Sequence, residues 1–488
     1  MSIINMDLLL DIGIALSKEK DADELLLTIL NAAMDITNAD GGTLYTVDEE
    51  ALHFHILSTR SRGILRCAHK GPIDLPPVGL SKSNVCAYSA ITRKLVNVAD
   101  VYTSERFDFT GPRRYDGITG YKTGSMLVVP MEDDQGEIIG VLQLINAQDG
   151  EGNIVAFDPA YESVVQSLAS QAAIRLTNMN YAAEVTELLD SFVRVMSTAI
   201  DARSPYNANH TRNMVKYANR FIDRLKYVQT DWDLETDRKQ FIMSVWLHDV
   251  GKLIIPLEIM DKDTRLGERM PYVIHKIELY RMWNRIDVLS GVVSSEEGAK
   301  RAQEIEDVEK LILRVDRMGF LTDEIIAEVE QLRDLRTRDR NGEWIPLLTE
   351  KELASLSIRA GTLTPEEREL MQSHVVMTRR MLDSMSFSKN YRNVMDWASR
   401  HHEMLDGSGY PDQMKGVNIP KEVRLLSIID IFDALTAQDR PYKPPMPPEK
   451  ALFVLENMVR KGQLDNEILN IFKQVKPWEA DWEQIKQA

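Results

Sequence analysis

The spacing of hydrophobic positions changes along the chain and predicts a mixed N-terminal region. Apolar residues recur at helical spacing between residues 5 and 37, where Asp21 and Glu24 can cap the second of two helices. From about residue 41 the period becomes two, as it does in half-buried strands. Segments 125–131 and 137–146 are joined by a turn-forming stretch and predict an antiparallel hairpin. We therefore expect an α+β domain over residues 1–178.

A long helix is expected after Phe157-Asp158-Pro159, with little in the sequence to end it before residue 201. Its second half, residues 179–201, carries an apolar seam made of Met179, Val185, Leu188, Phe192, Val195 and Met196. Such a seam is compatible with packing on its own domain, but we favour a parallel coiled coil that joins two copies of the chain. Beyond residue 202 helical periods dominate and strand patterns nearly vanish, so the C-terminal part, residues 202–488, should be all-helical.

The first region resembles a GAF domain, a common sensor module. The resemblance rests on the 125–146 hairpin, on Leu-Ile-Asn-Ala (144–147) and on Phe157-Asp158 before the long helix. Cyclic-nucleotide-binding GAF domains carry Lys or Arg after the Asn and an Asp-Glu pair further on. This chain has Ala147 and Tyr161-Glu162 instead, so we leave the small ligand of the sensor unassigned.

Composition narrows the function classes. The 488 residues are 44% apolar and 27% charged, as in globular proteins, and carry a formal charge of −17, which argues against binding a nucleic acid polymer. The two cysteines, Cys67 and Cys86, are too few for a disulfide framework, so a cytoplasmic protein with core thiols is expected. No apolar run approaches the length of a membrane span.

Histidines with neighbouring carboxylates mark the C-terminal half. The dipeptide His248-Asp249 ends a helix that should be buried almost all round, and it is followed by Val-Gly-Lys252. A buried Asp beside a buried His is costly unless a positive charge satisfies both, which a divalent metal does. Imidazole and carboxylate together suit Fe, Mn, Zn or Co.

A second motif follows from His401-His402-Glu403 through Asp406-Gly-Ser-Gly-Tyr410-Pro411, where closely spaced glycines predict a shaped loop beside the histidine pair. Asp430 and Asp433 share one face of the next apolar helix. Arg440 and Lys443 then flank a rigid turn, and a guanidinium suits phosphate oxygens.

Together these motifs, with His210 and with Leu363-Thr364-Pro-Glu-Glu367 leading to His374, resemble the HD-GYP domain, a subgroup of HD phosphohydrolases that hydrolyses cyclic di-GMP. The resemblance implies a helical bundle that holds two or three iron or manganese ions. The positions that match its metal ligands are His210, His248, Asp249, His374, His401, His402 and Asp430.

The family resemblance also implies roles for individual residues. Asp249 would bridge two metals, and Lys252 would neutralise charge on the phosphoryl oxygens. Arg440 and Lys443 would hold the substrate, with Tyr410 and Asp406 at the pocket wall. A metal-bound hydroxide would be the nucleophile.

Two departures from the family matter. Some members place a metal-binding Glu four residues before the first His, where this chain has Tyr206, so we expect two metal ions and pGpG as the main product. His374 follows His248 by 126 positions, far more than in the family, because an insertion occupies about 265–360. The pattern of the insertion predicts charged amphipathic helices. The insertion is either a surface elaboration without function or a lid, a dimer surface or a docking arm.

Two other functions remain open from sequence alone. The site could hydrolyse another cyclic dinucleotide, or it could bind a cyclic dinucleotide or a partner and signal without turnover. Product analysis separates these possibilities.

Overall fold

The computed structural model describes residues 13, 18–19, 21–48, 50–71, 73–204, 209–437 and 445–481. The chain divides into two compact units, residues 1–188 and 189–488. The expected helix before residue 21, Tyr206, Arg440 and Lys443 lie outside the described residues.

The N-terminal unit is built on an antiparallel sheet with the order β3-β2-β1-β7-β6-β5. Its main strands are β1 (Ala39–Val47), β2 (Ala51–Thr59), β3 (Ile64–Cys67), β5 (Val96–Val98), β6 (Met126–Glu132) and β7 (Ile138–Gln148), and two short strands, β4 (Val78–Gly79) and β8 (Ile154–Val155), pair with β2 and β7. The predicted hairpin is confirmed as β6–β7, with Val129 opposite Leu142.

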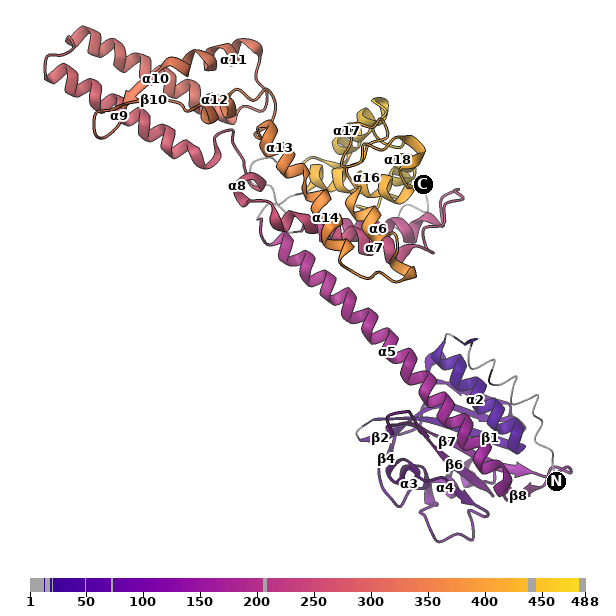
Figure 1. Cartoon of the computed structure of the whole chain (residues 1–488). Coiled ribbons are helices and arrows are strands. Elements are labelled where there is room, and N and C mark those ends of the chain that lie inside the picture. The colour runs from indigo at the N-terminus through magenta and orange to yellow at the C-terminus, as the bar shows by residue number, and fades with distance from the viewer. Residues whose placement is uncertain are drawn as a thin grey trace. The chain divides into compact units, whose positions relative to one another are not determined.

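Each face of this sheet has its own apolar core, because alternate residues of a strand point to opposite faces. Leu142 and Leu144 of β7 join the core formed with α2 (Ala22–Thr37) and the first part of α5 (Glu162–Asp201). Val141 and Ile145 face the core that contains α3 (Val85–Thr92), and α4 (Thr110–Thr119) follows on that side (Figure 1). Asp21 caps α2 as expected, accepting from the amides of Asp23 and Glu24.

The long helix is confirmed as α5. Only the two end residues of its apolar seam are packed against a core of the chain. Met179 packs against the N-terminal core and Met196 against a core of the C-terminal unit. The other seam residues stay exposed: Val185 by 57%, Leu188 by 70%, Phe192 by 56% and Val195 by 66%.

The C-terminal unit is a helical bundle around a large apolar core. Its helices are α6 (His210–Leu225), α7 (Arg238–Leu247), α8 (Leu257–Met260), α13 (Pro365–Gln372), α14 (His374–Asp383), α15 (Val394–Ser399), α16 (Lys421–Thr436), α17 (Pro448–Arg460) and α18 (Asn466–Val475). The predicted capping box Thr364–Glu367 starts α13. As expected, α7 is buried on nearly all sides, which carries His248 into the interior.

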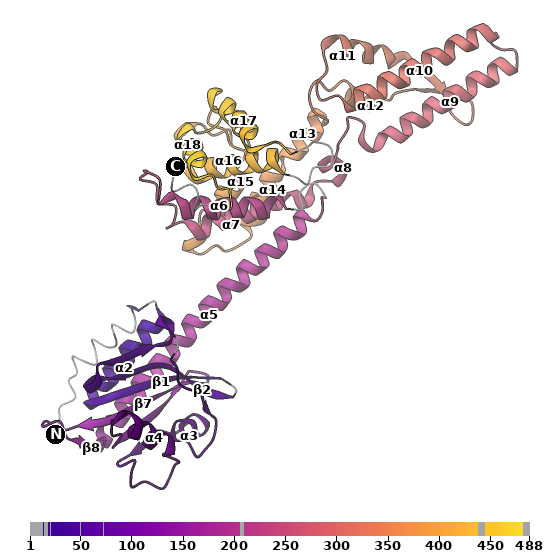
Figure 2. The same ribbon diagram turned by 180° about the vertical axis from the view of Figure 1, so that it is seen from behind.

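The insertion folds around a core of its own. It contains α9 (Met270–Leu289), α10 (Ser295–Arg317), α11 (Asp323–Glu330) and α12 (Glu350–Leu356), the last begun by the predicted Thr349–Glu352 capping box. Figure 2 shows α9 and α10 as a long helical pair.

The expectation of an all-helical C-terminal half is wrong at one point. Strands β9 (Arg336–Arg338) and β10 (Trp344–Pro346) form a small hairpin in the insertion. Asp339 shapes its turn by accepting from the amides of Asn341 and Glu343. The strands are too short to show a period of two, so sequence periodicity missed them.

Among the described residues, no helix is long and apolar enough to cross a membrane.

Candidate metal centre

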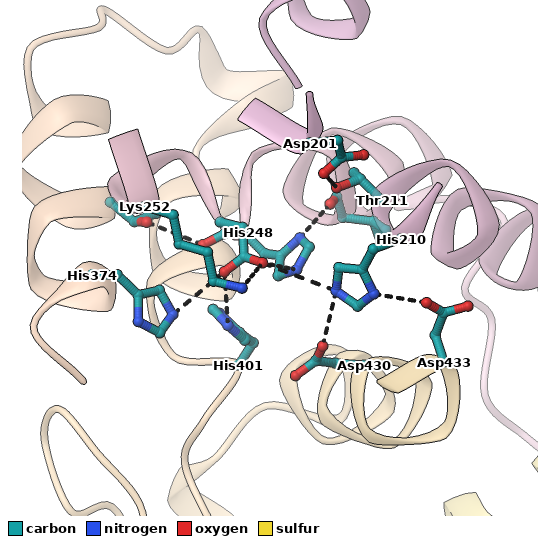
Figure 3. A network of polar contacts seen from close by, with 12 residues as sticks. Asp201, His210, Thr211, His248, Lys252, His374, His401, Asp430 and Asp433 are labelled. Carbon is teal, nitrogen blue, oxygen red and sulfur yellow. Dashed lines mark hydrogen bonds and ion pairs between the residues drawn. The ribbon is translucent and has the colours of Figure 1, made fainter. Parts of the chain in front are cut away.

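Seven predicted ligands from five parts of the chain meet in the C-terminal unit. Figure 3 labels His210, His248, His374, His401 and Asp430 among them. His248 and Asp249 follow the end of α7, whereas His210 and His374 are the first residues of α6 and α14. His401 and His402 follow α15, and Asp430 lies on α16. Two triads can be distinguished by their ligand atoms, which lie within 4.8 Å of one another: His210, His248 and Asp430, and His374, His401 and His402.

Asp249 lies between the two triads and faces each with a different oxygen. Its Oδ2 is 3.1 Å from His248 Nε2 and 3.9 Å from His210 Nε2. Its Oδ1 is 3.4 Å from His374 Nε2 and 3.9 Å from His401 Nε2. This is the placement of a carboxylate that can contact two cations at once.

Backbone carbonyls fix the tautomer of three of the histidines. His248, His374 and His401 each hold Nδ1 at 2.7 Å from the carbonyl three residues earlier, those of Val245, Met371 and Ala398. Because a carbonyl only accepts, Nδ1 carries the proton and Nε2 presents its lone pair. The same arrangement orients histidines that bind metals.

These lone pairs have no hydrogen-bond partner in the described part of the chain. Eight buried side-chain atoms there lack one, and five belong to this cluster: Nε2 of His248, His374 and His401, Oδ1 of Asp249 and Oδ1 of Asp433. Buried acceptors that converge without donors are costly unless a cation satisfies them. The donor set, five imidazoles and two carboxylates, therefore fits divalent metal ions.

The electrostatics keep most of these imidazoles neutral, as metal binding requires. Burial lowers the pKa of His401 well below its usual value and that of His402 to about 4. Burial also disfavours ionised Asp249, but His248 and Lys252 outweigh it and hold the Asp249 pKa well below its usual range.

His210 differs because two carboxylates hold it. Its Nδ1 lies 2.7 Å from Asp433 Oδ2, and its Nε2 lies 3.2 Å from Asp430 Oδ1. Burial lowers its pKa, but the two carboxylates outweigh burial and raise the pKa of His210 to about 10. With Nδ1–H donated to Asp433, a cation beside Nε2 would take the place of the second proton.

The turn after Asp249 is clamped onto α14. Thr378 Oγ1 accepts from the Gly251 amide and donates to the His248 carbonyl, at 3.0 Å in both cases. A Cβ at Gly251 would lie only 1.9 Å from the His374 carbonyl oxygen, so glycine is required for this approach. Lys252 Nζ lies 2.6 Å from Asp249 Oδ2 at the edge of the centre.

The predicted loop after the histidine pair packs against the second triad. The Tyr410 ring lies 4.9 Å from that of His402. Gly409 has no room for a side chain, because a Cβ would meet the backbone of Met404 at 2.3 Å. The Asp406 carboxylate accepts from the amide and hydroxyl of Ser408, which gives this residue a part in shaping the loop.

A polar cavity of about 360 Å³ opens beside Asp433. It is lined by Asn209, Asn213, Lys216, Tyr217, Asp433, Thr436 and Ala437. Lys216 lies on the exposed side of α6 and has no ion pair among the residues that the structure describes. A cation on the wall of a cavity next to the metal ligands suits a phosphate.

The end of α5 contacts the centre through two residues. Asp201 accepts a hydrogen bond from Thr211, the neighbour of His210, at 2.9 Å. Arg203 donates to the carbonyls of Lys252 and Leu253 and, at 3.2 Å, to that of Ile255. Two of the three elements that carry the first triad, α6 and the turn after α7, are thus tied to the end of α5.

The N-terminal unit contains a larger cavity, of about 700 Å³. Aromatic and aliphatic side chains dominate its wall, among them Tyr45, Phe54, Phe109 and Tyr121. Two of its polar side chains have partners in the same unit: Tyr45 donates to Gln143 at 2.9 Å, and Tyr121 donates to Asp40 at 2.7 Å. Cys86 on the wall is a free thiol whose pKa is raised to about 12 by burial.

Three contributors to the site escaped the sequence reasoning: Asp433 as the partner of His210, Thr378 as the clamp, and Arg203. The i, i+3 spacing of Asp430 and Asp433 marked both as buried acids without distinguishing their roles. Nothing in the sequence around Thr378 or Arg203 distinguishes them from ordinary surface or capping residues.

Comparison with known proteins assigns both units to families. The GAF domain family matches residues 21–176, and the HD domain family matches residues 350–468. The chain therefore has an N-terminal α+β GAF domain followed by a helical HD domain region. The HD match starts after most of the insertion, so it omits His210, His248 and Asp249. In the folded chain these three residues lie beside ligands of the matched part.

Relatives with assigned functions resemble parts of the chain. A 3′3′-cGAMP-specific phosphodiesterase 3 of Vibrio cholerae is 38% identical over 64% of this chain and 48% of its own length. A cyclic di-GMP phosphodiesterase of Thermotoga maritima is 35% identical over 24% of this chain and 34% of its own length. The 3′3′-cGAMP-specific phosphodiesterase 1 of Vibrio cholerae is 35% identical over 23% of this chain and 25% of its own length. The chain thus spans half or less of these curated relatives.

Proposed function

We propose that the HD domain region is a metal-dependent phosphodiesterase that hydrolyses cyclic di-GMP. The observation that carries the proposal is the convergence of unpartnered Nε2 lone pairs on both oxygens of Asp249. Two triads sharing one carboxylate imply two divalent ions, of which iron or manganese suits the imidazole-rich set. The names of the relatives in Vibrio cholerae and Thermotoga maritima support a cyclic dinucleotide as substrate.

The first triad, His210, His248 and Asp430, would hold one ion, and His374, His401 and His402 would hold the other, with Asp249 between them. Bound metal supplies a nucleophilic hydroxide near neutral pH and neutralises charge on the phosphate. Asp433 keeps the proton of His210 on Nδ1, so that Nε2 remains available.

The surrounding residues would orient the substrate. Lys252 stands beside Asp249, where its ammonium can stabilise charge that develops on the phosphoryl oxygens. Lys216 and Asn213 would bind the second phosphate in the polar cavity. The family resemblance adds Arg440 and Lys443 as substrate-binding cations. The Tyr410 ring would form the pocket wall. With two ions we expect linear pGpG as the main product.

A second substrate deserves a parallel test. The relative that matches the largest part of this chain, among those described above, is named for 3′3′-cGAMP. The two dinucleotides differ only in one base, whereas the candidate centre would contact their phosphates.

We further propose that the GAF domain regulates the enzyme through α5. A small ligand in the 700 Å³ cavity would alter the packing of the first part of α5, and Asp201 and Arg203 would pass the change to Thr211 and to the turn carrying Lys252. The exposed apolar seam of α5 would pair in parallel in a homodimer.

The decisive experiment is product analysis of the full chain, purified without oxygen and loaded with iron or manganese, with each dinucleotide in turn. Release of pGpG by protein holding two ions per chain is expected. Tight dinucleotide binding by metal-loaded protein without any product would replace the enzyme with a binding module.

Lys216→Met sharpens the assignment of the substrate cavity. We expect a higher KM for the dinucleotide and an unchanged rate with bis(p-nitrophenyl) phosphate, which needs the metals alone. Lys226→Met, on the same unit and remote from the cavity lining, serves as the matched control. Equal loss with both substrates would place Lys216 in the metal centre instead.

Arg203→Lys tests the coupling through α5. Lysine keeps the charge but cannot hold three carbonyls together, so we expect lower turnover with a full metal complement. Unaltered turnover would remove Arg203 from the regulatory route.

A further inference from the structure

Helix α9 of the insertion has apolar residues on two opposite faces. One face packs inside the insertion, where Val273 and Ile277 are fully buried. The other carries Tyr272, exposed by 70%, Met282 by 45%, Ile286 by 40% and Leu289 by 79%. A helix whose outer face served only for solvation would be polar there.

The neighbouring helix shows what such a solvated face looks like. The exposed side of α10 is crossed by ion pairs one turn apart: Lys300–Glu304, Arg301–Glu297 and Lys310–Glu306. Both helices belong to the same insertion and pack against each other. The outer face of α9 thus presents a row of apolar side chains where that of α10 presents ion pairs.

The outer residues of α9 are spaced like a coiled-coil seam. They alternate steps of three and four over the length of the helix: Tyr272, His275, Leu279, Met282, Ile286 and Leu289. A repeat of this kind keeps one stripe facing a partner helix. We call these six residues the α9 stripe.

We propose that the α9 stripe docks against the α9 stripe of a second copy of this chain, with the two helices antiparallel. The proposal is independent of the phosphodiesterase assignment.

The stripe is complementary to itself in that direction. Antiparallel pairing about the middle of α9 sets Tyr272 opposite Leu289 of the second copy, His275 opposite Ile286, and Leu279 opposite Met282. Each large residue thus meets a different apolar or aromatic neighbour, and the match repeats on both sides of the two-fold axis, as an isologous contact requires.

Charge selects the same direction. Glu278 and Arg285 flank the stripe on one side and are exposed, and neither has an ion pair among the residues that the structure describes. In the antiparallel pair Glu278 approaches Arg285 of the second copy, and the pair occurs twice. A parallel pair would set Glu278 beside Trp283 and Arg285 beside Ser290, without an opposite charge.

Cysteine cross-linking of the full chain tests the contact and its direction. Tyr272 and Leu289 are about 25 Å apart along one helix, so a disulfide cannot form between them within one chain. In the antiparallel pair each lies across from the other, within disulfide reach. Under mild oxidation we expect the Tyr272→Cys, Leu289→Cys double variant to form covalent dimers, with the 272–289 link found by mass spectrometry.

The single variants supply the control. Neither Tyr272→Cys nor Leu289→Cys alone should cross-link, whereas a mixture of the two should. The native Cys67 and Cys86 are buried, so wild-type chain gives the background. Cross-linking of a single variant to itself would mean parallel pairing and would overturn the proposal, as would the absence of any link in the double variant, which would assign the stripe to another partner.

Two substitutions within the α9 stripe distinguish cross-linking at a specific interface from cross-linking by random collision. Met282→Glu with Ile286→Glu, added to the double cysteine variant, should abolish the link, because both side chains are exposed and their loss leaves the fold intact. Leu313→Glu is the matched control, an exposed leucine on α10 outside the stripe. Cross-linking that survives the α9 changes, or that falls equally with Leu313→Glu, overturns the interface.

Discussion

Both units enclose polar side chains, but they satisfy them in different ways. In the GAF domain the tyrosine hydroxyls on the cavity wall find acceptors within the same unit, Gln143 for Tyr45 and Asp40 for Tyr121. In the HD domain region the buried Nε2 atoms of His248, His374 and His401 face acceptors only. A mainly apolar wall with bonded hydroxyls suits a small organic ligand, whereas converging lone pairs call for a cation. The comparison shows that hydrogen-bond accounting separates a ligand cavity from a metal centre better than size does.

The largest expected effect on this difference between the two units comes from removing the carboxylate of Asp249, which both triads face. Asp249→Asn leaves the shape of the side chain but loses the charge that faces both triads. We expect both metal ions to be lost and turnover to fall by roughly a thousandfold or more. Metal content per chain and initial rates measure the two effects.

The control is Asp334→Asn, which makes the same change at an exposed carboxylate of the same unit. Retention of two ions by Asp249→Asn would contradict a bridging role for this residue.

Metal removal should lower the thermal stability of the HD domain region and leave that of the GAF domain unchanged. A cation that binds only the folded HD domain region at a concentration 100-fold above its Kd stabilises it by about 2.7 kcal/mol. Calorimetry with and without chelator should therefore shift one unfolding transition downwards and leave that of the GAF domain in place. A shift of both transitions would mean that the two units unfold together or that the GAF domain also holds an ion.

A smaller effect is expected from Gly251→Ala. The added Cβ would lie 1.9 Å from the His374 carbonyl oxygen and 2.6 Å from the Thr378 amide, so the turn must move away from α14. We expect a loss of about 1–3 kcal/mol in unfolding free energy and weaker metal binding. Urea unfolding measures the first and metal titration the second.

Gly319→Ala is the matched control, because its Cβ would meet nothing within 4 Å. Equal destabilisation by both changes would show that the clamp at Gly251 is dispensable.

The smallest effect concerns the loop beside the second triad. Hydrogen bonds from Arg379, and then from Arg400, lower the pKa of Asp412 to about 2. Since the folded pKa is depressed, the ionised carboxylate stabilises the fold above pH 4, and this stabilisation is lost as pH falls towards 2. Asp412→Asn should cost less than about 1 kcal/mol at pH 7. Urea midpoints at several pH values should converge for the two proteins between pH 4 and 2, and a constant difference would refute the assignment.

The sequence predicted elements whose pattern is local. The β6–β7 hairpin, α5 and the caps of α12 and α13 follow from strict periods and from single side chains, and the structure has them. The buried character of α7 was likewise visible in its apolar run, which only Ser244 interrupts. Such features depend on neighbours within one turn or one strand pair.

Contacts between distant segments were harder to predict. The family resemblance marked the histidines and Asp430, but the partnership of His210 with Asp433 depends on how α6 packs against α16. The same holds for Thr378, which lies 130 positions from His248 and joins it through a backbone carbonyl. Backbone acceptors have no signature in side-chain sequence, so Arg203 and Thr378 could not be identified before the fold was known.

The two ends of the insertion meet where they leave the HD domain region. Thr362 donates to the carbonyl of Lys262, and Lys262 is paired with Glu367 at the start of α13. The arm between them has its own core. A short loop can therefore replace the whole arm without stretching the helical bundle, and the candidate ligands would keep their neighbours.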